Sequence, residues 1–340
     1  MKIEQVIQKA ERLRLDGYFK ESLRLWTRVY KRAIKNNFIE ITLDSLIVLG
    51  DLSRIIGNFK NAELYYNEAI ELSDILQNQL AKADALTGLC LAKKATGSWR
   101  DALQLIRHAR RIYKNNKDKK GIAFSYWAEG TIWRFGGRIK KSLEYFYIAQ
   151  TEFKKLKDKK ALAYAYCGIG GSSRVYGSYE DSMKYYKMAN QIFKELGDRF
   201  GIAYSFCGIG NAFRMLNDFN KAEKNFKEAL NLYAKIGDIV SSSYTLWSMA
   251  MLNILKKQYT IALHYIEKAE KNFKKCEDSR GLIYCKLLRG IIIYLKRKKK
   301  IAIKYFSEAL KKAMEYDFAL EKKYAQGFLN GKYSIPYNIP

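Results

Sequence analysis

The stretch AYCGIGGSSRVYGSYEDSMKYYKMANQIF (residues 165–193) returns in register as SFCGIGNAFRMLNDFNKAEKNFKEALNLY (residues 205–233). After its turn, the first copy places a small residue, a bulky residue and an alanine at Ser182, Tyr186 and Ala189. Spacings of four and three residues put side chains on one face of a helix. We therefore predict two helices in each copy, joined at Gly177 in the first copy and at Asn217 in the second.

The same period runs along the whole chain without insertion or deletion. The turn position is occupied by Gly17, Gly57, Gly97, Gly137, Gly177, Asn217, Lys257 and Arg297. The bulky position is occupied by Trp26, Tyr66, Ile106, Phe146, Tyr186, Phe226, Ile266 and Phe306. Aspartates at the other junction, such as Asp118 and Asp158, are expected to cap the next helix by accepting its free amide groups. We predict an all-α chain with eight units over residues 1–320, followed by a short capping helix and tail over 321–340.

This small–bulky–small spacing resembles the tetratricopeptide repeat, and the resemblance covers essentially the whole chain. The 40-residue unit is similar to the long-repeat subclass of Leu-Gly-Asn-rich scaffold proteins, although the proline that usually closes a unit is missing. The resemblance implies a right-handed α-solenoid whose first helices line a concave groove. It also implies capture of a partner segment in that groove, but it does not identify the partner.

Composition excludes several other classes of protein. The chain carries 62 Lys and Arg against 34 Asp and Glu, a net charge of +28, yet 48% of its residues are hydrophobic, which excludes a disordered basic tail. Its two prolines, Pro336 and Pro340, both lie at the C-terminal end, as expected for a mostly helical chain. No apolar run is long enough for a signal peptide or a membrane span. Five scattered cysteines suit a reducing compartment, so we expect a cytoplasmic protein.

Six basic residues share one position of the first helix and form a ladder along the array. They are Arg14, Arg54, Lys94, Arg134, Arg174 and Arg214. Glu11 and Asp51 precede the first two arginines by three residues, a spacing that allows ion pairs within a helix. The middle arginines lack an acidic residue at that offset, although Asp218 follows Arg214 closely. Two interpretations stay open for them: structural bonds to a neighbouring repeat, or binding of a carboxylate or phosphate.

Aromatic residues accompany the ladder on the same helices. Phe124, Tyr164, Tyr204 and Tyr244 share one position, and Trp127 and Trp247 share another. Rings at helical spacing often form a core. Here the small and bulky positions of each unit already supply the residues that pack the helices together. The additional rings therefore favour a hydrophobic binding wall. Both interpretations stay open.

The fifth and sixth units carry extra glycines inside their first helix, Gly168, Gly171 and Gly208. These serve either tight packing between neighbouring helices or close approach of a ligand. Cys167 and Cys207 lie one repeat apart, which is too far for an unstrained disulfide. With two histidines in separate repeats, the sequence offers no catalytic triad and no metal cluster. We expect no enzymatic activity and no cofactor.

Most of the positive charge lies outside the fifth and sixth units, in the runs 107–120, 154–160 and 295–304. We therefore expect a non-enzymatic adaptor or scaffold that binds a protein or peptide segment, with acidic or carboxylate groups, in the groove. The expected groove residues are Arg134, Arg174, Arg214, Phe124, Trp127, Tyr164, Tyr204, Tyr244, Trp247 and Asn211. The alternatives are binding of single-stranded RNA by arginines and rings, and self-association through the C-terminal end, including the tail 328–340.

Overall fold

The computed structural model describes residues 2–331, and these residues form seventeen α-helices. The helices are α1 (Ile3–Leu15), α2 (Phe19–Lys35), α3 (Ile39–Ile55), α4 (Phe59–Ile75), α5 (Gln79–Thr96), α6 (Trp99–Asn115), α7 (Lys119–Phe135), α8 (Ile139–Lys155), α9 (Lys159–Tyr176), α10 (Tyr179–Glu195), α11 (Arg199–Met215), α12 (Phe219–Ile236), α13 (Ile239–Leu255), α14 (Tyr259–Lys275), α15 (Ser279–Leu295), α16 (Lys299–Glu315) and α17 (Ala319–Leu329). The all-α array of eight helix pairs and a final helix is confirmed.

Local chemistry at the junctions explains where each helix begins and ends. Asp118 and Asp158 accept hydrogen bonds from the first turns of α7 and α9, and Asp198, Asp238 and Asp278 do the same for α11, α13 and α15. The turn position of every unit has a positive φ, from 59° at Lys257 to 109° at Gly177, which explains the recurring glycine. From the second unit onward, first helices begin two residues before the unit boundaries drawn from the sequence, because each helix starts directly after its capping residue.

Small residues hold the helix pairs together at close range. A Cβ atom on Gly208 would lie 2.2 Å from Cε1 of Tyr186, and one on Gly168 would lie 2.4 Å from Cε1 of Phe146. Each ring therefore packs directly on the glycine backbone of the next unit. This supports the packing interpretation of these two glycines and excludes larger side chains there unless the rings move.

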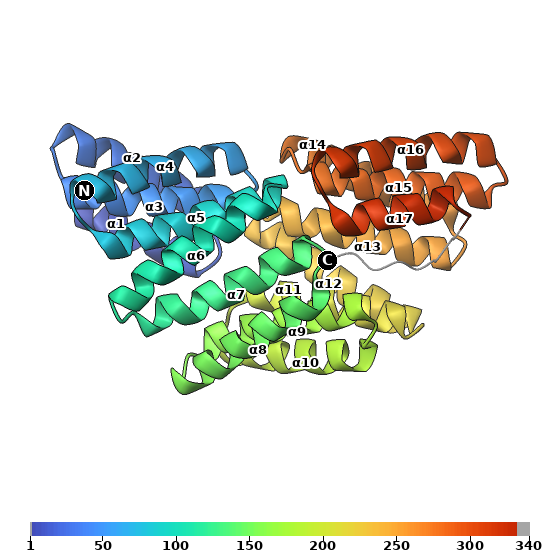
Figure 1. Cartoon of the computed structure of the whole chain (residues 1–340), viewed down its shortest axis with the longest axis horizontal. Coiled ribbons are helices and arrows are strands. Elements are labelled where there is room, and N and C mark those ends of the chain that lie inside the picture. Colours follow the sequence, from blue (N-terminus) through green and yellow to red (C-terminus); the bar gives the residue numbers. More distant parts are fainter. Residues whose placement is uncertain (1, 332–340) are drawn as a thin grey trace.

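The array curves until its two halves touch (Figure 1). Gly17 lies against Ile236, Gly57 against Cys276 and Gly97 against Tyr316. From one pair to the next, both partners advance by one full repeat, so the contacts follow a constant register. The turn of each early unit thereby rests on the end of the second helix five units later, and the solenoid closes on itself.

A buried arginine completes this closure. The side chain of Arg280, on α15, is 2% exposed and lies 4.1 Å from the ring centroids of both Phe135 and Phe318. Its Nη2 donates a hydrogen bond to the carbonyl oxygen of Phe135 at 3.0 Å. Its Nε lies 3.4 Å from a carboxylate oxygen of Glu321, which is fully buried. One side chain thus joins α7, α15 and α17.

The final helix α17 takes the first-helix position of a ninth unit and packs against α15 and α16. The greater part of the tail, residues 332–340, lies outside the described residues. None of the described helices is both long enough and apolar enough to cross a lipid bilayer.

Candidate functional site

The inner surface of the array encloses two adjoining cavities. The first, which we call the aromatic chamber, has a volume of about 370 Å³. Its walls include the rings of Phe19, Trp127, Tyr164, Phe200 and Tyr204. Its charged lining residues are Arg14, Arg54, Lys94, Arg134, Lys160, Asp198 and Arg199. Most of these residues come from first helices, so the chamber occupies the concave side that the ladder was expected to face.

The second cavity, which we call the cationic chamber, has a volume of about 240 Å³. It shares Lys94, Arg134 and Tyr204 with the aromatic chamber, so the two are neighbours. Its charged lining residues are Lys94, Arg134, Arg174 and Arg280. Neither Asp nor Glu is among the described residues that line it. The cationic chamber therefore concentrates positive charge in a small space.

The ladder changes character along its length, as the sequence predicts. Arg14 pairs with Glu11 at 2.6 Å, and Arg54 pairs with Asp51 at 3.0 Å. By contrast, Arg134 is 7% exposed, and within the described residues its buried Nε has no hydrogen-bond partner. The first rungs are thus neutralised within their own helix, whereas Arg134 presents an unsatisfied donor at the junction of the two chambers.

Burial and the concentration of positive charge lower the pKa of the Lys94 side chain. Burial, together with the positive charges of Arg134, Arg54 and Arg280, lowers the pKa of Lys94 from 10.5 to about 7. Its Nζ lies 4.4 Å from the ring centroid of Phe135, the same ring that Arg280 contacts. The electrostatic field in this part of the molecule therefore disfavours a further positive charge and favours a negative one.

The structure brings most of the expected groove residues to the chambers. Trp127 and Tyr164 line the aromatic chamber, Arg174, Tyr244 and Asn211 line the cationic chamber, and Arg134 and Tyr204 line both. Several of these rings also pack within the fold. The Tyr164 ring lies 4.8 Å from that of Phe193, and the Tyr244 hydroxyl donates to Asp278 at 2.9 Å. These side chains are therefore held in fixed orientations.

Three expected groove residues lie elsewhere. Trp247 is fully buried, with its ring 5.7 Å from that of Tyr284 in the C-terminal core. Phe124 is exposed and stacks on Trp127 with ring centroids 5.2 Å apart. Arg214 is fully buried and donates to the side-chain oxygen of Asn211 at 3.2 Å. The structure thus packs Trp247 against a ring of the next unit and holds Arg214 buried beside Asn211 of its own helix.

Gly171 and the cysteines serve packing and not chemistry. A Cβ atom on Gly171 would lie 2.4 Å from Nη1 of Arg134, so this glycine leaves room for the guanidinium group of the preceding unit. All five cysteines are free, and burial raises the pKa of the Cys167 and Cys207 thiols above the ordinary value. Such thiols are poor nucleophiles.

Among the described residues there is also no cluster of three or more His, Cys, Asp or Glu suited to a metal ion.

Sequence reasoning missed Arg280 and Phe200, and it named Lys94 only as a member of the ladder and not as a groove residue. Lys94 belongs to the recognised ladder, so its place in the chamber could have been inferred. Arg280 belongs to no ladder, because the equivalent positions carry unrelated residues such as Phe200 and Val240. Its contact with Phe135 joins helices that are far apart in the sequence, and no periodic signal reveals a contact of that kind.

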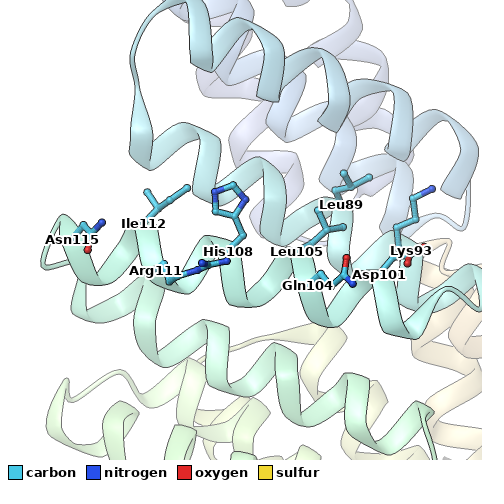
Figure 2. A pocket seen from close by; sticks show the side chains of 9 residues that line it. All are labelled: Leu89, Lys93, Asp101, Gln104, Leu105, His108, Arg111, Ile112 and Asn115. Carbon is cyan, nitrogen blue, oxygen red and sulfur yellow. The ribbon is translucent and has the colours of Figure 1, made fainter.

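A further hollow of about 700 Å³ is lined by the outer helix α6 together with α5 (Figure 2). Its lining includes Leu105, His108, Arg111 and Ile112 of α6, and Lys93 of α5. Lys93 pairs with Glu63 at 2.6 Å. Its lining residues His108, Arg111, Ile112 and Asn115 lie in the basic run 107–120, and none of its lining residues lines either chamber.

Comparison with known proteins agrees with this architecture. The structure of the Rap conjugation gene regulator of the plasmid pLS20, in complex with the Phr* peptide, has a TM-score of 0.69 and 13% identity over 93% of this chain and 96% of its own. A Rap protein complexed with Competence and Sporulation Factor has a TM-score of 0.63 and 12% identity over 97% of both chains. Aspartyl phosphate phosphatase F from Bacillus subtilis has a TM-score of 0.52 and 11% identity over 100% of this chain and 97% of its own.

At these identities the likeness shows the fold alone. No family model matches the sequence, and no curated protein matches it. The class of protein is nevertheless defined by the repeats, the helix pairs and these structural neighbours. The chain is an α-solenoid of tetratricopeptide-like repeats, closed around two internal chambers.

Proposed function

We propose that this chain is a non-enzymatic binding protein that takes a segment of a protein or peptide partner into the aromatic chamber. The observation that carries the proposal is the chamber itself, in which fixed rings and several cations face one enclosed space. Apolar side chains of the partner pack against Trp127, Tyr164 and Tyr204. Carboxylates of the partner accept hydrogen bonds from the cations of the chamber wall, which include Arg199.

Two of the structural neighbours support this use of the fold. One is described as a complex with a peptide and another as a complex with Competence and Sporulation Factor. A third is named an aspartyl phosphate phosphatase. Our proposal for this chain is restricted to binding, because rings and cations suit recognition of a segment that carries apolar and acidic groups.

Selection from displayed libraries of short linear peptides tests the proposal. One library is rich in Asp and Glu, and a second is rich in Lys and Arg. We expect binders from the acidic library, with dissociation constants in the micromolar range. Arg199→Glu, on the chamber wall, is expected to weaken them about tenfold or more, because it places a carboxylate beside the ligand.

Arg111→Glu is the matched control, since it makes the same charge reversal in the hollow on α6, outside both chambers. Its affinity for the selected peptides should stay close to that of the unmodified protein. Enrichment of basic peptides would show that the chamber does not bind acidic segments. An equal loss of peptide affinity in Arg199→Glu and Arg111→Glu would show the same. Displacement of the peptides by single-stranded RNA at low micromolar concentration would favour the nucleic-acid alternative instead.

A further inference from the structure

We propose that the cationic chamber is a binding site for a phosphoryl group, held by Lys94, Arg134 and Arg280. This inference goes beyond the proposed function and does not depend on it, because the aromatic chamber can bind a partner segment without the cationic chamber being filled. The two chambers share Lys94 and Arg134, but only the cationic chamber contains Arg280.

Three cations reach the chamber from three separate helices. Lys94 comes from α5, Arg134 from α7 and Arg280 from α15. Nε of Arg134 and Nη1 of Arg280 are buried donors without a hydrogen-bond partner among the described residues. Arg134 is 7% exposed and Arg280 is 2% exposed, so water reaches these donors poorly. An unsatisfied buried donor costs free energy until an acceptor arrives.

The charge balance of the cluster calls for an anion with more than one negative charge. Arg280 is compensated by Glu321 at 3.4 Å, whereas Lys94 and Arg134 have no ion-pair partner among the described residues. Arg174 adds a fourth positive charge to the lining. Buried charges in proteins are normally paired. A dianion would balance Lys94 and Arg134 together and would relieve their mutual repulsion.

Size and geometry favour a phosphoryl group over a longer anionic segment. The volume of about 240 Å³ lies below the roughly 300–1,000 Å³ typical of pockets for larger ligands. A single carboxylate is satisfied by one arginine fork. Donors that converge from three helices instead match the several oxygens of a tetrahedral group. Ser241, Ser248 and Asn211 supply further polar atoms to the same wall.

Titration calorimetry with inorganic pyrophosphate, phosphate and sulfate tests the site at constant ionic strength. We expect measurable binding of pyrophosphate and phosphate that chloride, the reference anion, does not compete away at equal concentration. Lys94→Met should weaken binding about tenfold or more. Lys93→Met is the matched control, because the neighbouring lysine pairs with Glu63 outside the chamber, and its affinity should be unchanged.

Sulfate separates the protonation of the protein from that of the ligand, because its charge is constant near neutral pH. Lys94 faces the cations Arg54, Arg134 and Arg280 and the Cys90 thiol, and its pKa in the free protein is about 7. The lysine loses its charge as the pH rises above that value. Sulfate should therefore bind several-fold more weakly at pH 9 than at pH 6.5, and Lys94→Met should abolish most of this dependence.

Lys94→Gln guards against a folding defect, since it keeps a polar side chain, and circular dichroism checks the helix content of both variants. Equal affinity for chloride and pyrophosphate would overturn the proposal. So would equal weakening in the Lys93 and Lys94 variants. Loss of pyrophosphate binding in Lys94→Met but not in Arg199→Glu would support it, and would separate it from the proposed function, because Arg199 lines the aromatic chamber and not the cationic chamber.

Two sources of the phosphoryl group are distinguished by a peptide pair. A selected peptide is compared with the same peptide carrying one phosphoserine. Tighter binding of the phosphorylated form, lost in Lys94→Met, would identify a phosphorylated partner segment as the source. Equal binding of the two peptides, together with pyrophosphate binding, would identify a free small molecule.

Discussion

Arg280 shows how one residue can hold distant parts of the array together. Its guanidinium group lies between the rings of Phe135 and Phe318, donates to a backbone carbonyl and faces the buried carboxylate of Glu321. Tyr284 donates a further hydrogen bond to Glu321. Removing one partner of a buried ion pair is costly, because the other charge is left without compensation.

We therefore expect Arg280→Met to lower the free energy of unfolding by about 3 kcal/mol, measured by urea denaturation. Arg289→Met is the control on the same helix, since Arg289 pairs with Glu270 at 2.9 Å in a partly exposed position. Arg289→Met should lower the free energy of unfolding by about 1 kcal/mol or less. Similar effects of the two substitutions would contradict the role assigned to Arg280.

At the scale of the element, each helix depends on contacts within or next to its own unit. The carboxylate of Asp158 accepts a hydrogen bond from the amide of Ala161 at 2.9 Å and so begins α9. The bulky residues Tyr66, Phe146 and Tyr186 of second helices rest on glycines of neighbouring first helices. Because such contacts recur from unit to unit, they leave a periodic record in the sequence.

Asp158→Ala should lower the free energy of unfolding by about 1 kcal/mol, since it removes the side-chain acceptor of the N-cap. Asp158→Asn keeps an acceptor oxygen and should cost only a small fraction of that. Urea denaturation of the two variants measures the difference. An equal loss in both would show that charge, and not the capping hydrogen bond, matters at this position.

This periodicity is why helix positions, turn residues and caps could be predicted from the sequence, whereas parts of the candidate site could not. The ladder indicated where Arg134 and Lys94 lie. It did not reveal that Trp247 and Arg214 are fully buried, since burial of one rung depends on how the neighbouring helices pack around it. The role of Arg280 could not be predicted because its partners lie in other units, and contacts between distant units leave no repeating pattern in the sequence.

At the scale of the whole molecule, closure depends on the contacts between successive turns of the solenoid. Gly57 has a φ of +85°, and a Cβ atom there would lie 2.6 Å from Val240 and 2.9 Å from Cys276. Gly177 has the same place in its unit and a φ of +109°, but nothing described lies within 4 Å of the equivalent position. The two glycines therefore differ chiefly in the contact across the closed array.

Alanine at either glycine should cost about 1–2 kcal/mol for the left-handed backbone. Gly57→Ala should lose about 1–3 kcal/mol more, because the added methyl group overpacks the contact with α13 and the end of α14. Urea denaturation gives both values, and small-angle X-ray scattering should show a larger radius of gyration for Gly57→Ala alone. Indistinguishable variants would indicate that these turns do not touch in solution.

The constant register between touching turns also limits how many repeats the molecule can have. In an open repeat array each unit contacts only its neighbours, so units can be gained or lost with little effect on the rest. Here, deletion of one internal unit would preserve the pairing of neighbours but move each early turn to a different partner. Gly57, for example, would meet the surface that now receives Gly97. Growth or shrinkage by whole units is thus restricted by the same register that encloses the chambers.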